Sequence, residues 1–387
     1  MIGLIWQNDR STLGYQLARK LSAAGHEVRL FVKNGLQYSK SGAKSGSKSD
    51  SKGGSKGSPK GDLKGRAGLD PTETELPTGV IRADSLGAAI KDAEVVITLM
   101  NTAQEVEDIY LGSGGIFENA LPASLFIDLS TSNPRLAREI HALAAVHDHR
   151  FIDAPLDGDA DMFQGGDLRI YAAGEPDNLK AALPLLYALT PDVLEAGLPG
   201  CGSTLKLASQ IALANVVMGV VEAITFSLVS GLEGEQILRA LELNPAARIA
   251  ARAFGKKMID EEFYYGLELQ QFFFDLSSAL DAADECGLAL PGLETAHQLY
   301  DLLVLVGGAK KGIHALALIY YEEDRCTRHG LNWELAQQAM DVYERANDGA
   351  YDDLDYDDEC DDEDCRYHAH HRPDDGPPTM SRYFSWN

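Results

Sequence analysis

The chain has 387 residues and a formal net charge of −25, with 45% hydrophobic and 24% charged residues. This length and composition predict a folded protein of two domains and exclude a fibrous or wholly disordered chain. The excess of acidic residues argues against binding to nucleic acid or to an anionic membrane, since both partners require clustered Lys and Arg.

The N-terminal segment predicts a strand, a helix and a second strand. Apolar runs over Ile2–Trp6 and Val28–Val32 flank a helical pattern that begins near Leu13. In dinucleotide-binding proteins a Gly-x-Gly-x-x-Gly turn connects such a strand to its helix and places a pyrophosphate at the helix N-terminus. Here the connection keeps only the last glycine, Gly14, and is longer by about three residues. We expect Gly14 to lie at the cofactor, but this loop alone does not identify a dinucleotide site.

The second strand ends Phe31-Val-Lys33-Asn34, with no carboxylate in reach. An Asp or Glu at this point accepts the ribose hydroxyls of NAD, whereas a basic residue favours the additional phosphate of NADP. We therefore expect Lys33 to bind that phosphate and NADP to be the preferred cofactor, with NAD possible.

Two segments depart from globular composition. Residues 39–66 are almost entirely Ser, Gly and Lys, with a lysine at every fourth position from Lys40 to Lys64, which predicts a disordered insertion. Residues 351–365 are rich in Asp and Glu and predict a disordered acidic tail. The Cys and His residues of the tail fit no standard zinc spacing, so we expect no metal site.

Three features bear on location. Five cysteines without framework spacing predict free thiols in a reducing compartment. Met1 leads directly into an apolar strand without a signal-peptide pattern, so we expect a cytoplasmic protein. The longest apolar stretch, Leu205–Leu232, contains Gln210, Asn215 and Glu222, which predicts a buried helix and not a membrane span.

The rest of the chain has two kinds of predicted secondary structure. Up to about Ala196, short apolar runs alternate with helical patterns, which predicts an α/β domain with a mostly parallel, doubly wound sheet. The further predicted strands are Val95–Met100, Leu125–Leu129, Phe151–Asp153 and Leu168–Ala172. From about Ser203 to His329 only helical patterns occur. We expect an α/β domain over 1–200, an all-helical domain over 201–330 and a C-terminal extension over 331–387.

Three motifs follow one another along the chain. They are Asp128-Leu-Ser130-Thr131-Ser-Asn-Pro134, then Phe151-Ile-Asp153-Ala-Pro155-Leu-Asp157-Gly158-Asp159, then Gly197-x-x-Gly200-x-Gly202-x-x-x-Lys206. In this order the chain resembles the β-hydroxyacid dehydrogenase family, which includes 3-hydroxyisobutyrate dehydrogenase and, more distantly, 6-phosphogluconate dehydrogenase. The resemblance covers about residues 1–329, interrupted by the basic insertion.

The resemblance implies a Rossmann domain, a long interdomain helix and an all-helical domain that mediates assembly into a homodimer or higher homo-oligomer. It also implies hydride exchange between a nicotinamide cofactor and a small alcohol or carbonyl substrate. Lys206 would be the catalytic residue, exchanging a proton with the substrate oxygen. Ser130, Thr131 and Asn101 would contact the cofactor. The glycines of the third motif would let the backbone approach the ligand.

The chain departs from the family in the substrate pocket. Asp157-Gly158-Asp159 replaces the family's Ser-Gly-Gly, which holds the substrate carboxylate, and Phe274 replaces a second lysine. Gln210 replaces an Asn and keeps the amide one methylene farther out. Two desolvated carboxylates would repel an anion by several kcal/mol. We therefore expect a neutral, aromatic, polyol or cationic substrate in place of a simple 3-hydroxy acid, unless the run Phe272–Phe274 belongs to the hydrophobic core.

Two other functions stay open. Related imine reductases reduce C=N bonds, although they carry a different residue at the position of Lys206. A catalytically silent, partner-binding protein would agree with the altered phosphate loop and the acidic tail.

Overall fold

A computed structural model of the chain describes residues 1–8, 13–34, 76, 78–158, 162, 165–264 and 268–347. The Lys-rich insertion, Asp159 and the acidic tail lie outside these residues. Contacts divide the chain into two compact units. Unit 1 contains Met1–Ala214 and Gln271–Glu294, and unit 2 contains Asn215–Gln270 and the residues from Thr295 onward. This division differs from a boundary near residue 200, because three helices contribute residues to both units.

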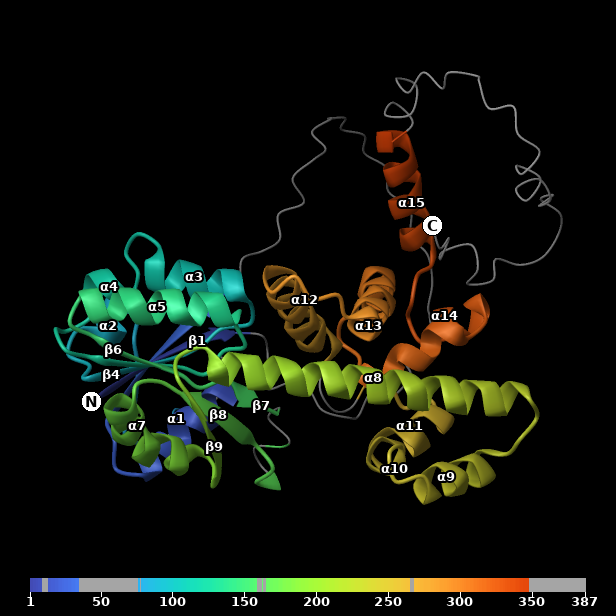
Figure 1. The fold of residues 1–387 in the computed structure, drawn as a ribbon, viewed down its shortest axis with the longest axis horizontal. Coiled ribbons are helices and arrows are strands. Elements are labelled where there is room, and N and C mark those ends of the chain that lie inside the picture. Colours follow the sequence, from blue (N-terminus) through green and yellow to red (C-terminus); the bar gives the residue numbers. More distant parts are fainter. Residues whose placement is uncertain are drawn as a thin grey trace, which may run out of the picture. The chain divides into compact units, whose positions relative to one another are not determined.

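Unit 1 is built on a single sheet of nine strands (Figure 1). They are β1 (Ile2–Asn8), β2 (Val28–Asn34), β3 (Val80–Arg82), β4 (Val95–Leu99), β5 (Leu125–Asp128), β6 (Arg150–Asp153), β7 (Leu156–Asp157), β8 (Arg169–Ala173) and β9 (Asp192–Gly197). The sheet order is β3-β2-β1-β4-β5-β6-β8-β7, with β9 paired to β8. Only the pairings of β8 with β6 and with β7 are antiparallel. The mostly parallel sheet predicted from the sequence is confirmed.

Side chains alternate between two hydrophobic cores, one on each face of the sheet. On β1, Ile2, Leu4 and Trp6 enter one core and Ile5 enters the other. The first core is covered by α1 (Leu13–Ala23) and α7 (Pro176–Leu189). The second is covered by α2 (Leu86–Ile90), α3 (Ala103–Leu111), α4 (Ile116–Asn119) and α5 (Pro134–Val146). Helices therefore lie on both faces, as Figure 1 shows.

The order of the parallel strands, 3-2-1-4-5-6, reverses direction between β1 and β4. In open sheets of this kind, ligands bind at the carboxyl ends of the strands beside the point of reversal. The polar residues of the sequence motifs lie just beyond β4, β5 and β6, at that same edge of the sheet. The fold thus brings the predicted site residues of unit 1 to one edge.

The long helix α8 (Cys201–Val229) begins in unit 1 and ends in unit 2. It is long and apolar enough to cross a membrane, but the core helices of soluble proteins meet the same criterion. The expected burial is only partly found, because 28% of its most apolar window is buried. Phe226 and Val229 near its end are 74% and 84% exposed.

Unit 2 is helical, and among the described residues its β pairing is limited to one isolated bridge between Glu268 and Gly312. After α8 the helices are α9 (Gly234–Leu243), α10 (Arg248–Ala250), η1 (Ala251–Gly255), α11 (Lys256–Ile259), α12 (Leu269–Glu285), α13 (Pro291–Leu303), η2 (Val304–Gly308), η3 (Ile313–Tyr320), α14 (Glu323–Arg328) and α15 (Glu334–Asn347). Most of α12 belongs to unit 1. The prediction that this part of the chain is helical is confirmed.

Candidate active site

The segment Gly197–Lys206 connects β9 to α8, and its glycines let this connection pack tightly. Gly197 and Gly200 have φ angles of 106° and 88°, in the left-handed region that favours glycine. A Cβ on Gly202 would collide with the backbone oxygen of Tyr171. A Cβ on Gly200 would lie 2.8 Å from the backbone oxygen of Pro134. Gly200 and Gly202 therefore permit a close approach to protein backbone.

Asp153, at the end of β6, holds the first turn of α8. Its carboxylate accepts hydrogen bonds from the backbone N–H of Ser203 at 2.9 Å and from the Ser203 hydroxyl at 2.7 Å. A carboxylate is stabilised there by the unpaired N–H groups of the helix N-terminus. Burial nevertheless raises the pKa of Asp153 to about 6. Because Ser203 and Lys206 share a helix face, Asp153 fixes the point from which Lys206 extends.

Lys206 is buried between two carboxylates. Its Nζ donates a hydrogen bond of 2.8 Å to Oδ1 of Asp157, at the end of β7, and lies 3.6 Å from Oδ2 of Asp275 on α12. The side chains of Lys206 and Asp275 are each 4% exposed. A buried ammonium group requires such partners, since desolvation penalises an isolated charge. The predicted catalytic lysine thus lies in an enclosed, charged site.

Asp157 is the most heavily bonded side chain of this site. Besides Lys206, it accepts hydrogen bonds from Gln210 at 3.0 Å, Tyr171 at 3.0 Å and Ser209 at 3.4 Å. Burial acts to raise its pKa, but the charge and hydrogen bond of Lys206 outweigh burial, and the pKa of Asp157 lies below its ordinary value. Asp157 is therefore an ionised and paired carboxylate, whereas the sequence suggested a free charge that repels anions.

Gln210 lies one helical turn beyond Lys206 and is 1% exposed. Its Nε2 donates to Asp157, whereas its Oε1 has no hydrogen-bond partner among the described residues. A buried amide oxygen without a donor costs about 1–3 kcal/mol, unless water or a ligand supplies one. Gln210 therefore presents an unused acceptor beside the Lys206–Asp157 pair.

Asp275 was not predicted as a site residue, although it directly follows Phe274, where the family lysine was expected. It accepts hydrogen bonds from Gln271 Nε2 at 3.1 Å and from the side chain of Thr131. Gln271 Nε2 also donates to the backbone oxygen of Asn101 at 3.0 Å. Burial raises the pKa of Asp275 in spite of the nearby ammonium group. Through Asp275 and Gln271, the predicted residues Thr131 and Asn101 are connected to Lys206.

Ser130 connects the ends of two strands. Its hydroxyl donates to Oδ1 of Asp128 at 2.6 Å and accepts from the backbone N–H of Met100 at 2.8 Å. Asp128 also accepts from Thr98 at 2.8 Å, and burial raises the pKa of Asp128 to about 7. The proton of Ser130 is thus used inside the protein, and its hydroxyl fixes the ends of β4 and β5 relative to each other.

The edge between β1 and β4 fits a nicotinamide dinucleotide. A Cβ on Gly14 would collide with the Trp6 ring, so Gly14 permits close packing of α1 on β1, which is the role of the third glycine in the fingerprint. Gln7, at the end of β1, is 2% exposed, and its Oε1 has no partner among the described residues. Lys33 is half-buried and is paired in register with Gln7. Residues 9–12 lie outside the described residues.

The remaining predicted pocket residues have varied positions. Phe272 is buried in the core, in agreement with the alternative reading of the aromatic run, whereas Phe274 is half-buried with its ring 6.3 Å from that of Phe273. Gly158 has a φ of 136° and directly follows Asp157. Asp159 lies outside the described residues. Within the described part of the chain, no group of three or more His, Cys, Asp or Glu could hold a metal ion.

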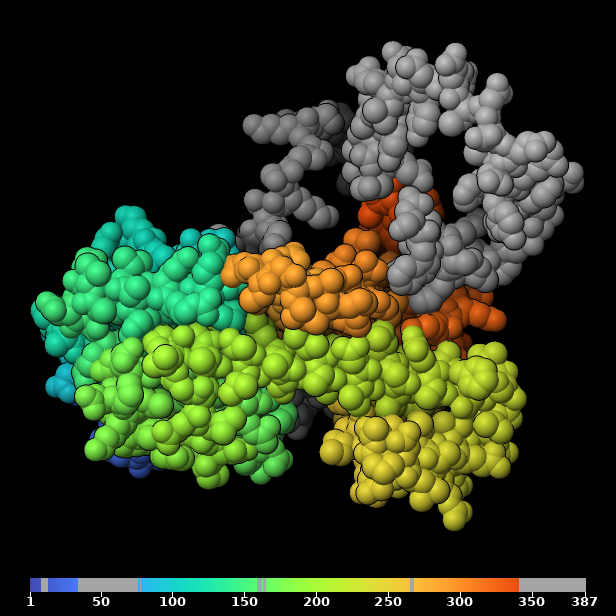
Figure 2. All heavy atoms as spheres, in the orientation of Figure 1, coloured from blue at the N-terminus to red at the C-terminus, as the bar shows by residue number. Residues whose placement is uncertain are grey.

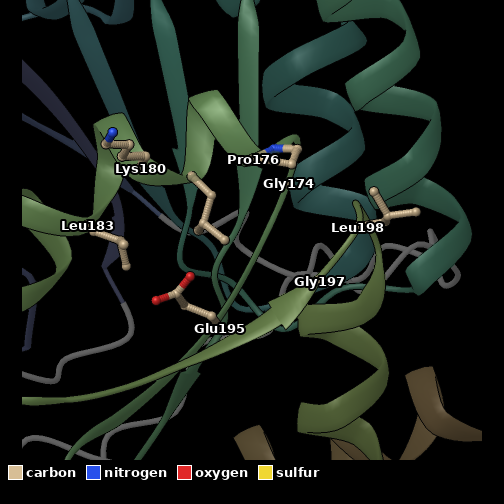
Figure 3. A pocket seen from close by; sticks show the side chains of 8 residues that line it. Gly174, Pro176, Lys180, Leu183, Glu195, Gly197 and Leu198 are labelled. Carbon is tan, nitrogen blue, oxygen red and sulfur yellow. The ribbon is translucent and has the colours of Figure 1, made fainter.

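An open pocket of about 450 Å³ lies elsewhere on unit 1, between α7 and β9 (Figure 3). Apolar side chains dominate its lining, together with Lys180 and Glu195. Neither Lys206 nor any of its hydrogen-bond partners contributes to it. The pocket therefore lies apart from the candidate active site.

Known sequence families match most of the chain. The model of the NAD binding domain of 6-phosphogluconate dehydrogenase matches residues 66–197, and that of the NAD-binding domain of NADP-dependent 3-hydroxyisobutyrate dehydrogenase matches residues 200–320. The first match begins at the last residue of the insertion, so it excludes β1, α1 and β2, where the glycine fingerprint is altered.

Individual proteins show the same relationship. The uncharacterized oxidoreductase YkwC of Bacillus subtilis is 32% identical over 64% of this chain and 86% of its own length. The probable 3-hydroxyisobutyrate dehydrogenase-like 1 of Arabidopsis thaliana is 30% identical over 65% of this chain and 75% of its own length. The solved 3-hydroxyisobutyrate dehydrogenase of Mycobacterium tuberculosis with L-serine shares the fold, with a TM-score of 0.63 and 23% identity over 82% of this chain and 98% of that chain.

Proposed function

Because the chain belongs to the β-hydroxyacid dehydrogenase family of NAD(P)-dependent oxidoreductases, we propose that it transfers hydride between a nicotinamide and a small alcohol or carbonyl, with Lys206 as the proton donor and acceptor. The observation that carries this proposal is the buried ammonium group of Lys206, near the start of α8, which Asp157 of β7 holds by an ion pair. Asp275 joins it to Thr131, and Gln271 joins Asp275 to the end of β4.

Lys206 handles the proton in both directions. In reduction, its ammonium group donates a proton to the carbonyl oxygen of the substrate. In oxidation, its amine form takes the proton of the substrate hydroxyl. The bound nicotinamide supplies or accepts the hydride. Asp157 keeps Nζ in one position by a charge-assisted hydrogen bond, which is shorter and stronger than a neutral one.

We propose that the substrate is not a simple 3-hydroxy acid. Two features support this: Asp157 replaces a small hydroxyl side chain that would hold a carboxylate, and Phe274 replaces the second lysine. With both carboxyl groups ionised, Asp157 and Asp275 outnumber the single charge of Lys206. An additional carboxylate from the substrate would increase this imbalance, which costs most where water is excluded.

We propose that NADP is the preferred cofactor. Lys33 is the basic residue at the end of β2, and no Asp or Glu is present at that strand end. A lysine there attracts the additional phosphate of NADP. Titration with NADPH and NADH tests this preference, and weaker binding of NADPH than of NADH would contradict it.

We further propose that the helical part of the chain mediates self-association into a homodimer or larger assembly. In unit 2, Phe226, Val229, Leu243 and Ile249 are between 74% and 84% exposed. Figure 2 shows the side chains of α8 at the surface. A contiguous exposed apolar patch commonly marks a protein interface, and we propose that these side chains belong to one. Light scattering on the purified chain and on a Phe226→Glu variant tests this, and a wild-type monomer would contradict it.

We propose a reducing compartment, the cytoplasm, as the location. Among the described residues, Cys201, Cys286 and Cys326 are free thiols. Thiol-specific labelling of protein isolated under non-reducing conditions tests this, and blocked cysteines would contradict it.

A further inference from the structure

The Lys206 site contains more negative than positive charge. Lys206 contributes one positive charge, whereas Asp157 and Asp275 each contribute one negative charge when ionised. Arg169 lies 4.0 Å from Asp157, but it is 45% exposed and is paired with Asp192 at 2.8 Å. It therefore contributes little inside the site. An uncompensated buried carboxylate is costly, and the raised pKa of Asp275 is one result of that cost.

The site also contains a buried hydrogen-bond acceptor that has no donor in the described part of the chain. Gln210 Oε1 has no donor among the described residues, although the other end of the same amide is bonded to Asp157. Oδ2 of Asp275 lies 3.6 Å from Lys206 Nζ, which is longer than a hydrogen bond. An acceptor is thus unused on α8, and the Asp275 carboxylate on α12 lies beside the same ammonium group without a hydrogen bond to it.

A ligand suits this site if it supplies both a positive charge and a hydrogen-bond donor for Gln210 Oε1. An alkylammonium group supplies up to three donors, one positive charge and no acceptor. A diol supplies donors without charge. A hydroxy acid adds a carboxylate, and therefore more acceptors and more negative charge. Of these three, only the ammonium group supplies both a positive charge and a donor for Gln210 Oε1.

We propose that the substrate is an amino alcohol, or the corresponding amino carbonyl compound, whose ammonium group is bound by Asp275 and Gln210 Oε1 while its oxygen lies at Lys206. This inference rests on the proposed function and names its substrate class. In oxidation the C–H bond breaks with hydride transfer to the oxidised nicotinamide, and the O–H proton passes to Lys206 and then to solvent. The products are an amino carbonyl compound, a reduced nicotinamide and one proton.

Three matched probes test the proposal: 3-aminopropan-1-ol, propane-1,3-diol and 3-hydroxypropanoate. They share one primary alcohol and differ in an ammonium, a hydroxyl and a carboxylate group. Calorimetric titration of the full chain with reduced NADP or NAD present measures binding without turnover. We expect the amino alcohol to bind about tenfold or more tightly than either other probe, in keeping with a hydrogen bond between charged groups.

Asp275→Asn removes the charge and keeps the shape of the side chain. We expect it to reduce the preference for the amino alcohol over the diol by about tenfold or more. Asp284→Asn is the matched control, because Asp284 is an exposed carboxylate on the same helix. The control should retain the wild-type preference. If Asp275→Asn does not fold, the order of the three binding affinities on the wild-type chain still tests the proposal.

The outcomes separate this inference from the proposed function. Tighter binding of the diol or of 3-hydroxypropanoate, or no binding of any probe, overturns the inference. Oxidation of the diol or the hydroxy acid in that case would leave the proposed function intact. Conversely, selective binding of the amino alcohol without oxidation of any probe supports the ammonium-binding site, whereas it contradicts the proposed reaction and the role of the amino alcohol as substrate.

Discussion

The Nζ of Lys206 donates a hydrogen bond of 2.8 Å to Oδ1 of Asp157, and the two side chains are 4% and 18% exposed. The pair joins the end of β7 to the first turns of α8. The family resemblance implies a serine at the position of Asp157, so the aspartate gives Lys206 a charged partner in this chain. The predictions below follow from this pair and from the groups that hold it.

Asp157→Asn should lower the free energy of unfolding by about 1–3 kcal/mol, because it leaves a buried ammonium with only the more distant Asp275 as a charged partner. Urea denaturation measures the change. Asp192→Asn is the matched control, since Asp192 is 51% exposed in its pair with Arg169 and should change stability by less than about 0.5 kcal/mol. Equal changes in the free energy of unfolding would show that the buried Lys206–Asp157 pair stabilises the fold no more than the exposed pair does.

Gly202→Ala should lower the free energy of unfolding by about 1–3 kcal/mol through overpacking, because its Cβ would meet the backbone oxygens of Tyr171 and Asp153. Gly219→Ala, on the same helix, is the control. A Cβ on Gly219 has no neighbour within 4 Å, so that substitution should raise stability by about 0.5–1 kcal/mol. Thermal unfolding of both variants provides the comparison, and a stable Gly202→Ala protein would contradict the packing described for α8.

Asp128 should make folding depend on pH in a defined direction. Its pKa in the folded chain is raised to about 7 by burial, above its ordinary value of 3.8, with Tyr110 and Asp153 as titratable neighbours. The stability it contributes is therefore present at low pH and is lost as the pH rises from about 4 to about 7, at up to about 1.4 kcal/mol per pH unit.

The measurement is the difference in unfolding free energy between the wild type and Asp128→Asn across this range. Wild-type stability should fall relative to the variant as the pH rises. If wild-type stability instead stayed constant or rose relative to the variant as the pH increased, Asp128 would be ionised throughout this range.

Phe274→Lys introduces the lysine that the family resemblance implies at this position. It should shift the preference among matched alcohols towards 3-hydroxypropanoate by about tenfold, because an added cation favours a carboxylate. Phe273→Lys, at the adjacent position of α12, is the control. Ratios of kcat/KM for 3-hydroxypropanoate and propane-1,3-diol give the result, and equal shifts in the two variants would remove position 274 from substrate selection.

The sequence was sufficient for the parts of the fold that depend on local pattern. Buried apolar runs predicted six strands, and the loss of strand signal after Ser203 predicted the helical part. β3, β7 and β9 were not predicted, because β3 and β7 are short and β9 is largely exposed without an apolar run. These strands are defined by pairing with neighbours, which the local sequence does not encode.

The site was predicted only in part, for a related reason. Lys206 and Gln210 follow from a motif and a helical spacing, but Asp275 and Gln271 come from a helix more than sixty residues later and meet Lys206 only through the fold. The sequence also did not show that Asp157 is paired. The sequence gives the sign of its charge, whereas its partner becomes visible only when β7 and α8 are in place.

Lys206→Ala tests the central claim most directly, with NADPH and NADH binding and the oxidation of the best alcohol probe measured on the same protein preparation. We expect the cofactor dissociation constant to stay within about threefold and kcat to fall by about 10²–10⁴, the range of general acid–base catalysis. Unchanged kcat with unchanged cofactor binding would contradict the assignment of Lys206 as the proton-transfer residue.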